Sequence, residues 1–145
     1  MADAEPSNRE GTADIDRSSR LCIVTLGETG PVVLAGPTPL PEAAASVVTR
    51  VGDFRPLAVS RAYDVLTGPL GPLVRVAGLA EGRWALRVSG AFRDDRSWEA
   101  AVAFAHLAAA AGVDLVDDPD RATRLVVVAG ALDADLGLEI GRAHV

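Results

Sequence analysis

The residue types that could do chemistry gather around Ser97, which follows the acidic pair Asp94 and Asp95. A serine hydroxyl becomes a nucleophile only when a positioned base accepts its proton, and at neutral pH the candidate bases are His106 and His144. His106 lies nine residues further along the same predicted helix, about 13 Å away at 1.5 Å per residue, so it cannot reach Ser97. One hypothesis is therefore a serine hydrolase that uses Ser97 with His144 and Asp94 or Asp95.

The same residues also have structural interpretations, which the sequence favours. Ser97 or Asp95 is expected to cap the following helix, because a side-chain oxygen there accepts an otherwise unpaired backbone N–H. The helix dipole stabilises acidic side chains such as Glu99 in a first turn. Glu99 and His106 share the thin polar stripe of an otherwise apolar helix, so we expect them at its solvent edge or at a contact site.

Two arginines form the candidate binding site for a small anion. Arg83 and Arg87 lie on one face of a predicted strand, although such side chains commonly cover a sheet face. A second acidic cluster contains Asp114, Asp117, Asp118 and Asp120. It lacks the glycine and the closing glutamate of a calcium loop, so we predict no metal site. No glycine-rich segment has the spacing of a phosphate-binding loop, and we predict no cofactor.

Composition excludes several classes of protein. All 14 basic residues are arginine, so the chain has no lysine for a Schiff base, a P-loop or a Ser–Lys dyad. The net charge of −6 argues against binding to a phosphate backbone, and we expect no nucleic-acid partner. No apolar stretch approaches the ~20 residues of a membrane span. The single cysteine, Cys22, fits a reducing compartment, so we expect a cytoplasmic protein with no membrane contact.

The N-terminal half combines a polar tail with the start of a folded domain. Residues 1–20 are acidic and nearly free of large aliphatic side chains, so we predict a disordered tail there and a single domain over 21–145. Two β-branched runs with a glycine-rich turn between them predict a hairpin over 21–34. Residues 42–51 carry the start and stop signals of a helix. Residues 57–66 fit a helix and a strand equally well.

The C-terminal half has clearer periodicity. Residues 73–77 and 83–89 predict a second hairpin, in which the later strand alternates apolar and polar side chains. Residues 97–112 predict an alanine-rich helix whose circumference is mostly covered. Residues 124–130 predict a strand buried on both faces. The expected fold is α+β, a mixed sheet covered by helices with a right-handed βαβ unit in this half.

The strings RVSGAFRDDRSWEAAVAFAHLAAAAG and RLVVVAGALDADLGLEIGRAHV, within residues 87–145, resemble the C-terminal domain of Lon-type proteases and the related RadA and ComM domains. The resemblance implies a ribosomal S5 domain 2-like fold. It places Ser97 near the catalytic serine of that family and His144 where its catalytic lysine stands. Arg96, Trp98 and Glu99 replace the glycines that flank the serine in the family. Without a lysine, the chain resembles a non-peptidase member.

We therefore predict a non-catalytic domain that acts in protein interaction or regulation, through a protein partner or self-association. The apolar, Pro/Gly-rich loop at 69–73 offers a contact surface. The alternatives are the serine hydrolase that uses Ser97 with His144, and a sensor of small anionic ligands that uses Arg83 and Arg87.

Overall fold

The computed structural model describes residues 19–75, 78–80, 82–133, 137–138 and 142–144. The strands are β1 (Arg20–Leu26), β2 (Pro31–Leu34), β3 (Thr38–Pro39), β4 (Val47–Arg50), β5 (Trp84–Val88), β6 (Asp114–Leu115), β7 (Arg124–Ala129), β8 (Leu132–Asp133), β9 (Gly137–Leu138) and β10 (Arg142–His144). The α-helices are α2 (Ser60–Thr67), α3 (Pro72–Arg75) and α4 (Glu99–Ala110), and a short 3-10 helix, η1 (Pro119–Arg121), lies between β6 and β7. Residues 1–18 of the predicted tail lie outside the described residues. Arg20, the last residue of the predicted tail, belongs to β1.

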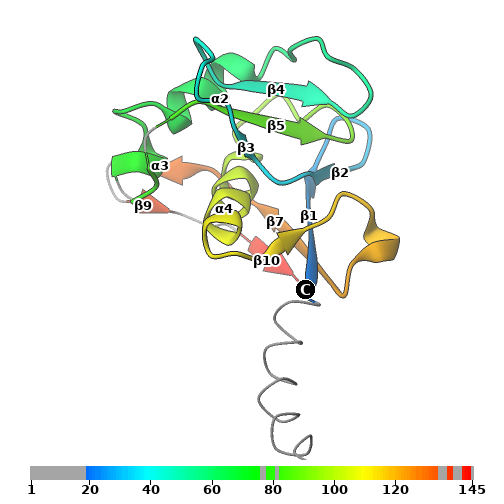
Figure 1. Cartoon of the computed structure of the whole chain (residues 1–145). Coiled ribbons are helices and arrows are strands. Elements are labelled where there is room, and N and C mark those ends of the chain that lie inside the picture. Colours follow the sequence, from blue (N-terminus) through cyan, green and yellow to red (C-terminus); the bar gives the residue numbers. More distant parts are fainter. Residues whose placement is uncertain (1–18, 76–77, 81, 134–136, 139–141, 145) are drawn as a thin grey trace, which may run out of the picture.

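Within the described residues, one mixed sheet of eight strands organises the chain, in the order β10-β7-β1-β2-β5-β3 (Figure 1). Strand β4 pairs with β5, β6 pairs with β1, and β8 with β9 forms a separate pair. Strand β1 is parallel to β6 and β7 and antiparallel to β2, while β5 is antiparallel to β2 and parallel to β4. The predicted α+β class with a mixed sheet is confirmed.

The predicted hairpin over 21–34 is confirmed as β1 and β2. Ile23 lies opposite Leu34 and Leu26 opposite Pro31, and the turn closes through a hydrogen bond of 2.7 Å from the N–H of Gly27 to the carbonyl of Gly30. Gly30 has φ of 148°, which side-chain-bearing residues rarely adopt, so a glycine is required at this turn. The β-branched residues on either side then extend as strands.

The predicted helix over 42–51 is wrong, because residues 47–50 form strand β4. Val47, Val48 and Thr49 are β-branched, which favours an extended backbone. Their backbone pairs in parallel with β5, with Val48 opposite Leu86. The Val48 side chain is fully buried in the main core, so tertiary packing overrides the helical start and stop signals.

The segment between β4 and β5 contains two helices. The undecided residues 57–66 fall mainly in α2, which begins at Ser60. The predicted strand at 73–77 is wrong over its described part, because Pro72–Arg75 is helix α3, and residues 76–77 lie outside the described residues. Pro72 stands at the first position of α3, where its fixed φ suits a helix and its missing N–H has no intrahelical partner to lose.

The elements predicted for the C-terminal half are largely present. Strand β5 alternates as expected, with Leu86 and Val88 buried and Arg87 exposed. Helix α4 is covered over most of its circumference and is followed by Gly112 at φ of 87°. Strand β7 is not buried on both faces, because only Val126 and Val128 of its six residues are buried.

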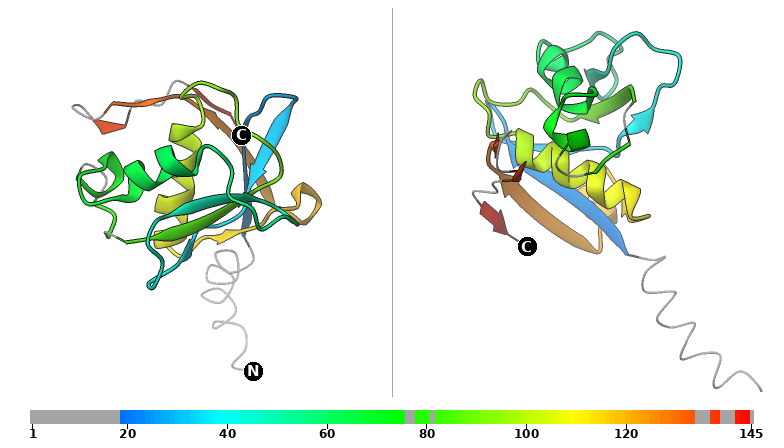
Figure 2. Two further views of the ribbon diagram at one scale, coloured as in Figure 1. Left: turned by 90° about the horizontal axis from the view of Figure 1, so that it is seen from above. Right: turned by 90° about the vertical axis from the view of Figure 1, so that its left-hand side faces the viewer.

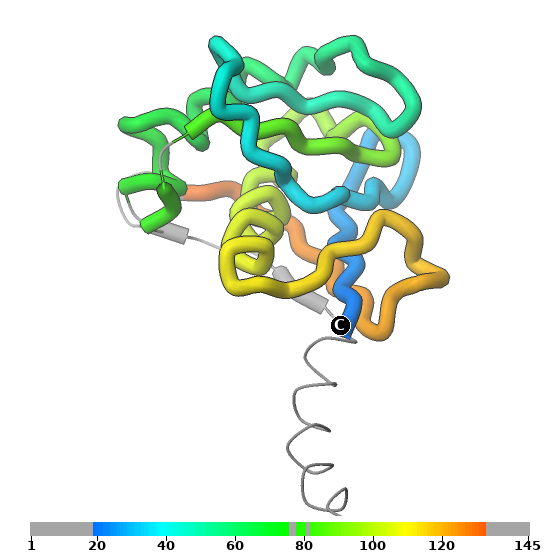
Figure 3. The backbone as a smooth tube through the Cα atoms, in the orientation of Figure 1, coloured from blue at the N-terminus to red at the C-terminus, as the bar shows by residue number. Residues whose placement is uncertain are grey.

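Strands β5 and β7 run in the same direction, with β1 and β2 lying between them in the sheet, and the chain passes from β5 through α4 and the short strand β6 to β7. The two strands of the predicted strand–helix–strand unit, β5 and β7, are therefore parallel but are not neighbours in the sheet. Its right-handed crossover stays a prediction. Figure 3 shows the tube of β1 beside that of β7, although about a hundred residues of chain separate them.

Most buried apolar side chains form one core between the sheet and the helices. Ile23, Leu34, Leu86 and Val128 from the strands meet Tyr63 from α2 and the alanine-rich face of α4 in this cluster. Helix α4 packs against β1 and β7, as Figure 2 shows. A smaller cluster on the opposite face of the sheet contains Cys22, Val24 and Val116. The larger core therefore fixes the position of α4 and of the loop that leads into it.

Candidate functional site

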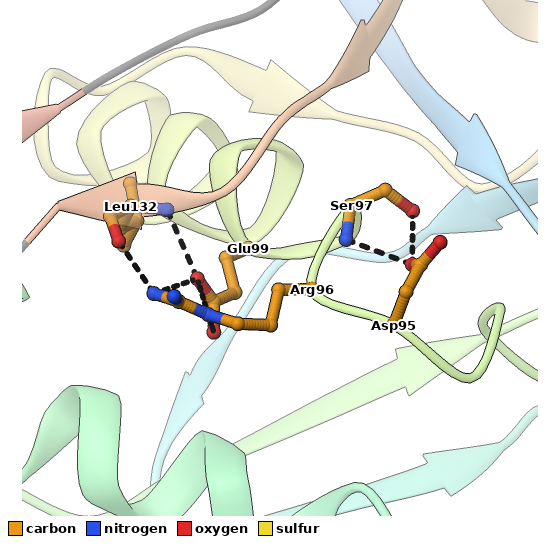
Figure 4. A network of polar contacts seen from close by, with 5 residues as sticks. All are labelled: Asp95, Arg96, Ser97, Glu99 and Leu132. Atoms are coloured by element: carbon orange, nitrogen blue, oxygen red, sulfur yellow. Dashed lines mark hydrogen bonds and ion pairs between the residues drawn. The ribbon is translucent and has the colours of Figure 1, made fainter.

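The loop that leads into α4 holds Asp95 and Ser97 in contact. The Ser97 hydroxyl donates to Asp95 Oδ1 at 2.6 Å, and the Ser97 N–H donates to the same oxygen at 2.9 Å (Figure 4). These two bonds hold the pKa of the Asp95 carboxyl below its ordinary value, the hydroxyl bond being the larger cause. A carboxylate with a lowered pKa is a weak base, so Asp95 is a poor acceptor for the proton of the serine hydroxyl.

Neither Asp95 nor Ser97 occupies the N-cap of α4, so the prediction that one of them caps this helix is wrong. Trp98 stands at that place and no side chain accepts an N–H there. The backbone takes over part of this role, because the Ala100 N–H donates to the Gly130 carbonyl at 2.9 Å. The Gly130 N–H in turn donates to the Ser97 carbonyl at 2.9 Å. Gly130, the residue after β7, therefore accepts a backbone N–H that has no partner within the first turn of the helix.

Glu99 is buried, with 7% of its surface exposed, which overturns its expected place at a solvent edge. Its Oε1 accepts the N–H of Leu132 at 2.9 Å, and the Arg96 guanidinium lies 3.0 Å from the same oxygen. Arg96 also donates to the Leu132 carbonyl (Figure 4). Arg96 and Glu99 therefore bind both polar backbone groups of Leu132 and attach the head of α4 to β8.

His106 is buried as well, with 1% exposed, because α4 turns this face toward α2 and β5. Its Nε2 lies 2.7 Å from the hydroxyl of Tyr63, and its ring meets the ring of Trp84 edge to face at 4.9 Å. Burial lowers the pKa of His106 to about 4 and raises that of Tyr63. His106 is therefore neutral at pH 7 and belongs to the core.

The hydrolase hypothesis also requires His144 beside Ser97. Strand β10 places residue 144 opposite Val127, while Ser97 bonds to Gly130, three residues further along the chain. Three residues of extended chain span about 10 Å. The position of the His144 side chain lies outside what the structure describes. The described residues thus bring Asp95 to Ser97, and the serine hydroxyl donates to Asp95 rather than to Asp94.

The two arginines of the predicted anion site line different hollows. Arg83 lies beside Trp84 and Pro39, and its Nε donates to the carbonyl of Ala44 at 3.1 Å. Arg87 lines a hollow of about 360 Å³ together with Asp114, Asp117 and Arg121. A single small anion would not contact both residues.

The structure adds a hollow that the sequence did not predict, and we call it the α4 hollow. It has a volume of about 490 Å³ and lies beside the loop that leads into the helix. Its apolar lining includes Leu57, Val59, Phe92 and Trp98, and its charged lining consists of Glu28, Arg93, Asp94, Asp95, Arg96 and Glu99. Only Asp94, Asp95 and Glu99 of these were candidate residues. Glu28 lines the hollow because its neighbour Gly27 pairs with Phe92, which is distant in the chain. No local sequence pattern indicates such a long-range pairing.

Within the described part of the chain, no group of three or more His, Cys, Asp or Glu side chains is arranged to hold a metal ion. The same part contains no helix with the length and apolar character needed to cross a membrane.

The fold and the site define an α+β protein with a mixed sheet, in which the buried Glu99 and the exposed Arg96 tie the head of the main helix to the start of β8. Comparisons with protein-family models, with curated proteins and with solved structures find no match to the chain.

Proposed function

We propose that the chain is a non-catalytic protein-association domain, which binds a protein partner or a second copy of itself. The observation that carries the proposal is the exposure of Leu70 (84%) and Val65 (64%), which line one shallow hollow with Pro69. We call these three residues the Leu70 patch. Neighbouring apolar side chains exposed together are typical of interaction surfaces.

The loop that carries Leu70 is ordered by its own hydrogen bonds. The Gly71 N–H donates to the Gly68 carbonyl at 2.9 Å, and Nε of Arg75 donates to the Leu70 carbonyl at 3.1 Å. Gly71 packs so closely on the carbonyls of Val65 and Leu66 that a Cβ would overlap them. Because the loop is already fixed, association through the patch would cost little conformational entropy.

The chemistry of the chain supports a role without catalysis. The absence of lysine removes a Ser–Lys dyad, and the lowered pKa of Asp95 makes it a weak base for Ser97. The resemblance of residues 87–145 to RadA and ComM domains supports the same role. The order β5, α4, β6, β7 supports our further proposal that the fold is S5 domain 2-like.

Sedimentation velocity over a range of protein concentrations tests self-association. We expect the mass of the wild-type chain to rise above 15.0 kDa with concentration, and Leu70→Asp to abolish that rise. Phe54→Asp is the matched control, because Phe54 is also exposed and lies outside the patch. An equal rise in Leu70→Asp would contradict the proposal for self-association.

A partner of another sequence is tested by capture from source-cell extract with the same three proteins as bait. A stoichiometric protein retained by wild type and Phe54→Asp, and lost with Leu70→Asp, would support the proposal. Monomeric behaviour at all concentrations, together with capture that Leu70→Asp leaves unchanged, would overturn it.

A further inference from the structure

The α4 hollow carries a surplus of negative charge above an apolar floor. Arg93 lies 3.6 Å from Asp95, and Arg96 lies 3.0 Å from Glu99, so both arginines of the lining are paired with its acids. Glu28 and Asp94 also line the hollow. Neither has a side-chain hydrogen bond or an ion pair within the described residues. Among the described residues, these two carboxylates have no counter-charge.

The floor of the hollow is aromatic and aliphatic. The rings of Phe92 and Trp98 stack at 5.4 Å with planes 2° apart, and both side chains are buried. Leu57 and Val59, which precede α2, also belong to the apolar lining. A volume of about 490 Å³ lies within the range of small-molecule sites, which are mostly apolar with a few polar groups that orient the ligand.

The walls of the hollow are joined by backbone contacts. Gly27 pairs with Phe92 in an antiparallel bridge, and the Glu28 N–H donates to the Ala91 carbonyl at 3.2 Å. A Cβ at Gly27 would lie 2.8 Å from that same carbonyl, so glycine permits this close approach. The β1–β2 turn is thereby attached to the segment before α4, and Glu28 belongs to the same hollow as Asp94.

We propose that the α4 hollow binds a small organic cation with an apolar body, such as an arylalkyl ammonium. The apolar body would pack on the floor, and the ammonium would lie near Glu28 and Asp94. A neutral ligand would form no ion pair with the carboxylates, and an anion would be repelled by them. The inference is independent of the Leu70 patch, which shares none of the residues that line this hollow.

A titration with three probes of one shape tests the proposal: 4-phenylbutylamine, 4-phenylbutanol and 4-phenylbutyrate, which carry a positive, zero and negative charge. Binding is followed by NMR through the indole N–H of Trp98. The indole N–H of Trp84, which lies outside the hollow, is the internal reference. A Trp84→Phe variant assigns the two resonances.

We expect a saturable shift of the Trp98 resonance with the amine and none at Trp84. The alcohol should bind about three- to tenfold more weakly, since one or two solvent-exposed ion pairs are lost, and the butyrate more weakly still. Binding of the alcohol or the butyrate as tight as that of the amine would overturn the proposal. So would the absence of a saturable Trp98 shift with the amine.

Three variants separate the carboxylates of the hollow from the general charge of the protein. Glu28→Gln and Asp94→Asn should each weaken amine binding about threefold, and together about tenfold. Glu42→Gln is the matched control, because Glu42 is exposed and lies outside the hollow. An unchanged amide spectrum confirms that each variant is folded. An equal loss of affinity in Glu42→Gln would contradict the assignment of the site.

Discussion

The hydroxyl of Tyr63 in α2 lies 2.7 Å from Nε2 of His106 in α4, and both side chains are buried. This contact joins two helices that are separated along the chain by β5. The other ring nitrogen of His106, Nδ1, is buried without a partner in the described residues. The imidazole is therefore held neutral in the core, where a positive charge would have no counter-ion among its neighbours Tyr63 and Trp84.

Stability should fall when the pH is lowered through the titration range of His106. Burial lowers its pKa from 6.5 to about 4, so between these values the unfolded chain binds a proton that the folded chain excludes. The wild type should lose about 2 kcal/mol between pH 7 and 4.5 from this group, and lose little more from it below pH 4. His106→Gln should lack this component. Urea unfolding of both proteins at the two pH values measures it, and equal losses would contradict the prediction.

Removal of the Glu99 carboxylate should destabilise the attachment of α4 to β8. Glu99→Ala leaves the buried N–H of Leu132 and the Arg96 guanidinium without this acceptor, and should lower the free energy of unfolding by about 2 to 3 kcal/mol. Glu99→Gln keeps an acceptor oxygen and should lower it by about 1 kcal/mol. Urea denaturation measures both. Asp94→Asn is the control and should leave stability unchanged, and a Glu99→Ala variant as stable as this control would refute the assignment.

Ser97 should not react as a nucleophile. Its hydroxyl donates to Asp95, whose lowered pKa makes it a weak proton acceptor. Incubation with a fluorophosphonate should therefore give no labelling above that of Ser97→Ala, as measured by intact-protein mass spectrometry. Covalent labelling of wild type that is lost in Ser97→Ala would instead favour the hydrolase that uses His144.

Two glycines should differ in their tolerance of alanine. A Cβ at Gly71 would overlap the backbone carbonyls of Val65 and Leu66, so Gly71→Ala should cost about 3 kcal/mol of stability. Gly52 faces open space at φ of 85°, and Gly52→Ala should cost about 1 kcal/mol through backbone strain alone. Thermal unfolding of both variants tests the difference, and equal losses would show that the loop carrying Leu70 is not held tightly.

Local patterns in the sequence were sufficient to predict several helices and strands. The hairpin of β1 and β2 follows from two β-branched runs around a glycine-rich turn. Helix α4 follows from an alanine-rich run that ends before Gly112, and β5 from strict alternation. In these segments the local preference of the backbone and the tertiary environment agree, so the pattern alone indicates the structure.

Other elements depended on contacts that no local pattern encodes. Residues 47–50 carry β-branched side chains between helix signals. Their pairing with β5 determines that they form a strand. Pro72 began a helix in a segment whose apolar residues predicted a strand. Such short segments have nearly balanced preferences, so a few hydrogen bonds and buried side chains from distant residues decide their conformation.

By itself, the sequence determined which chemistry is absent, since a chain without lysine cannot form a Ser–Lys dyad. It also determined the α+β class through its periodic segments. Only the tertiary structure decided that Glu99 and His106 are buried, and that Glu28 lines the same hollow as Asp94. The physical reason is that burial and charge pairing depend on neighbours brought together by the sheet, such as β1 and β7, which are far apart in the chain.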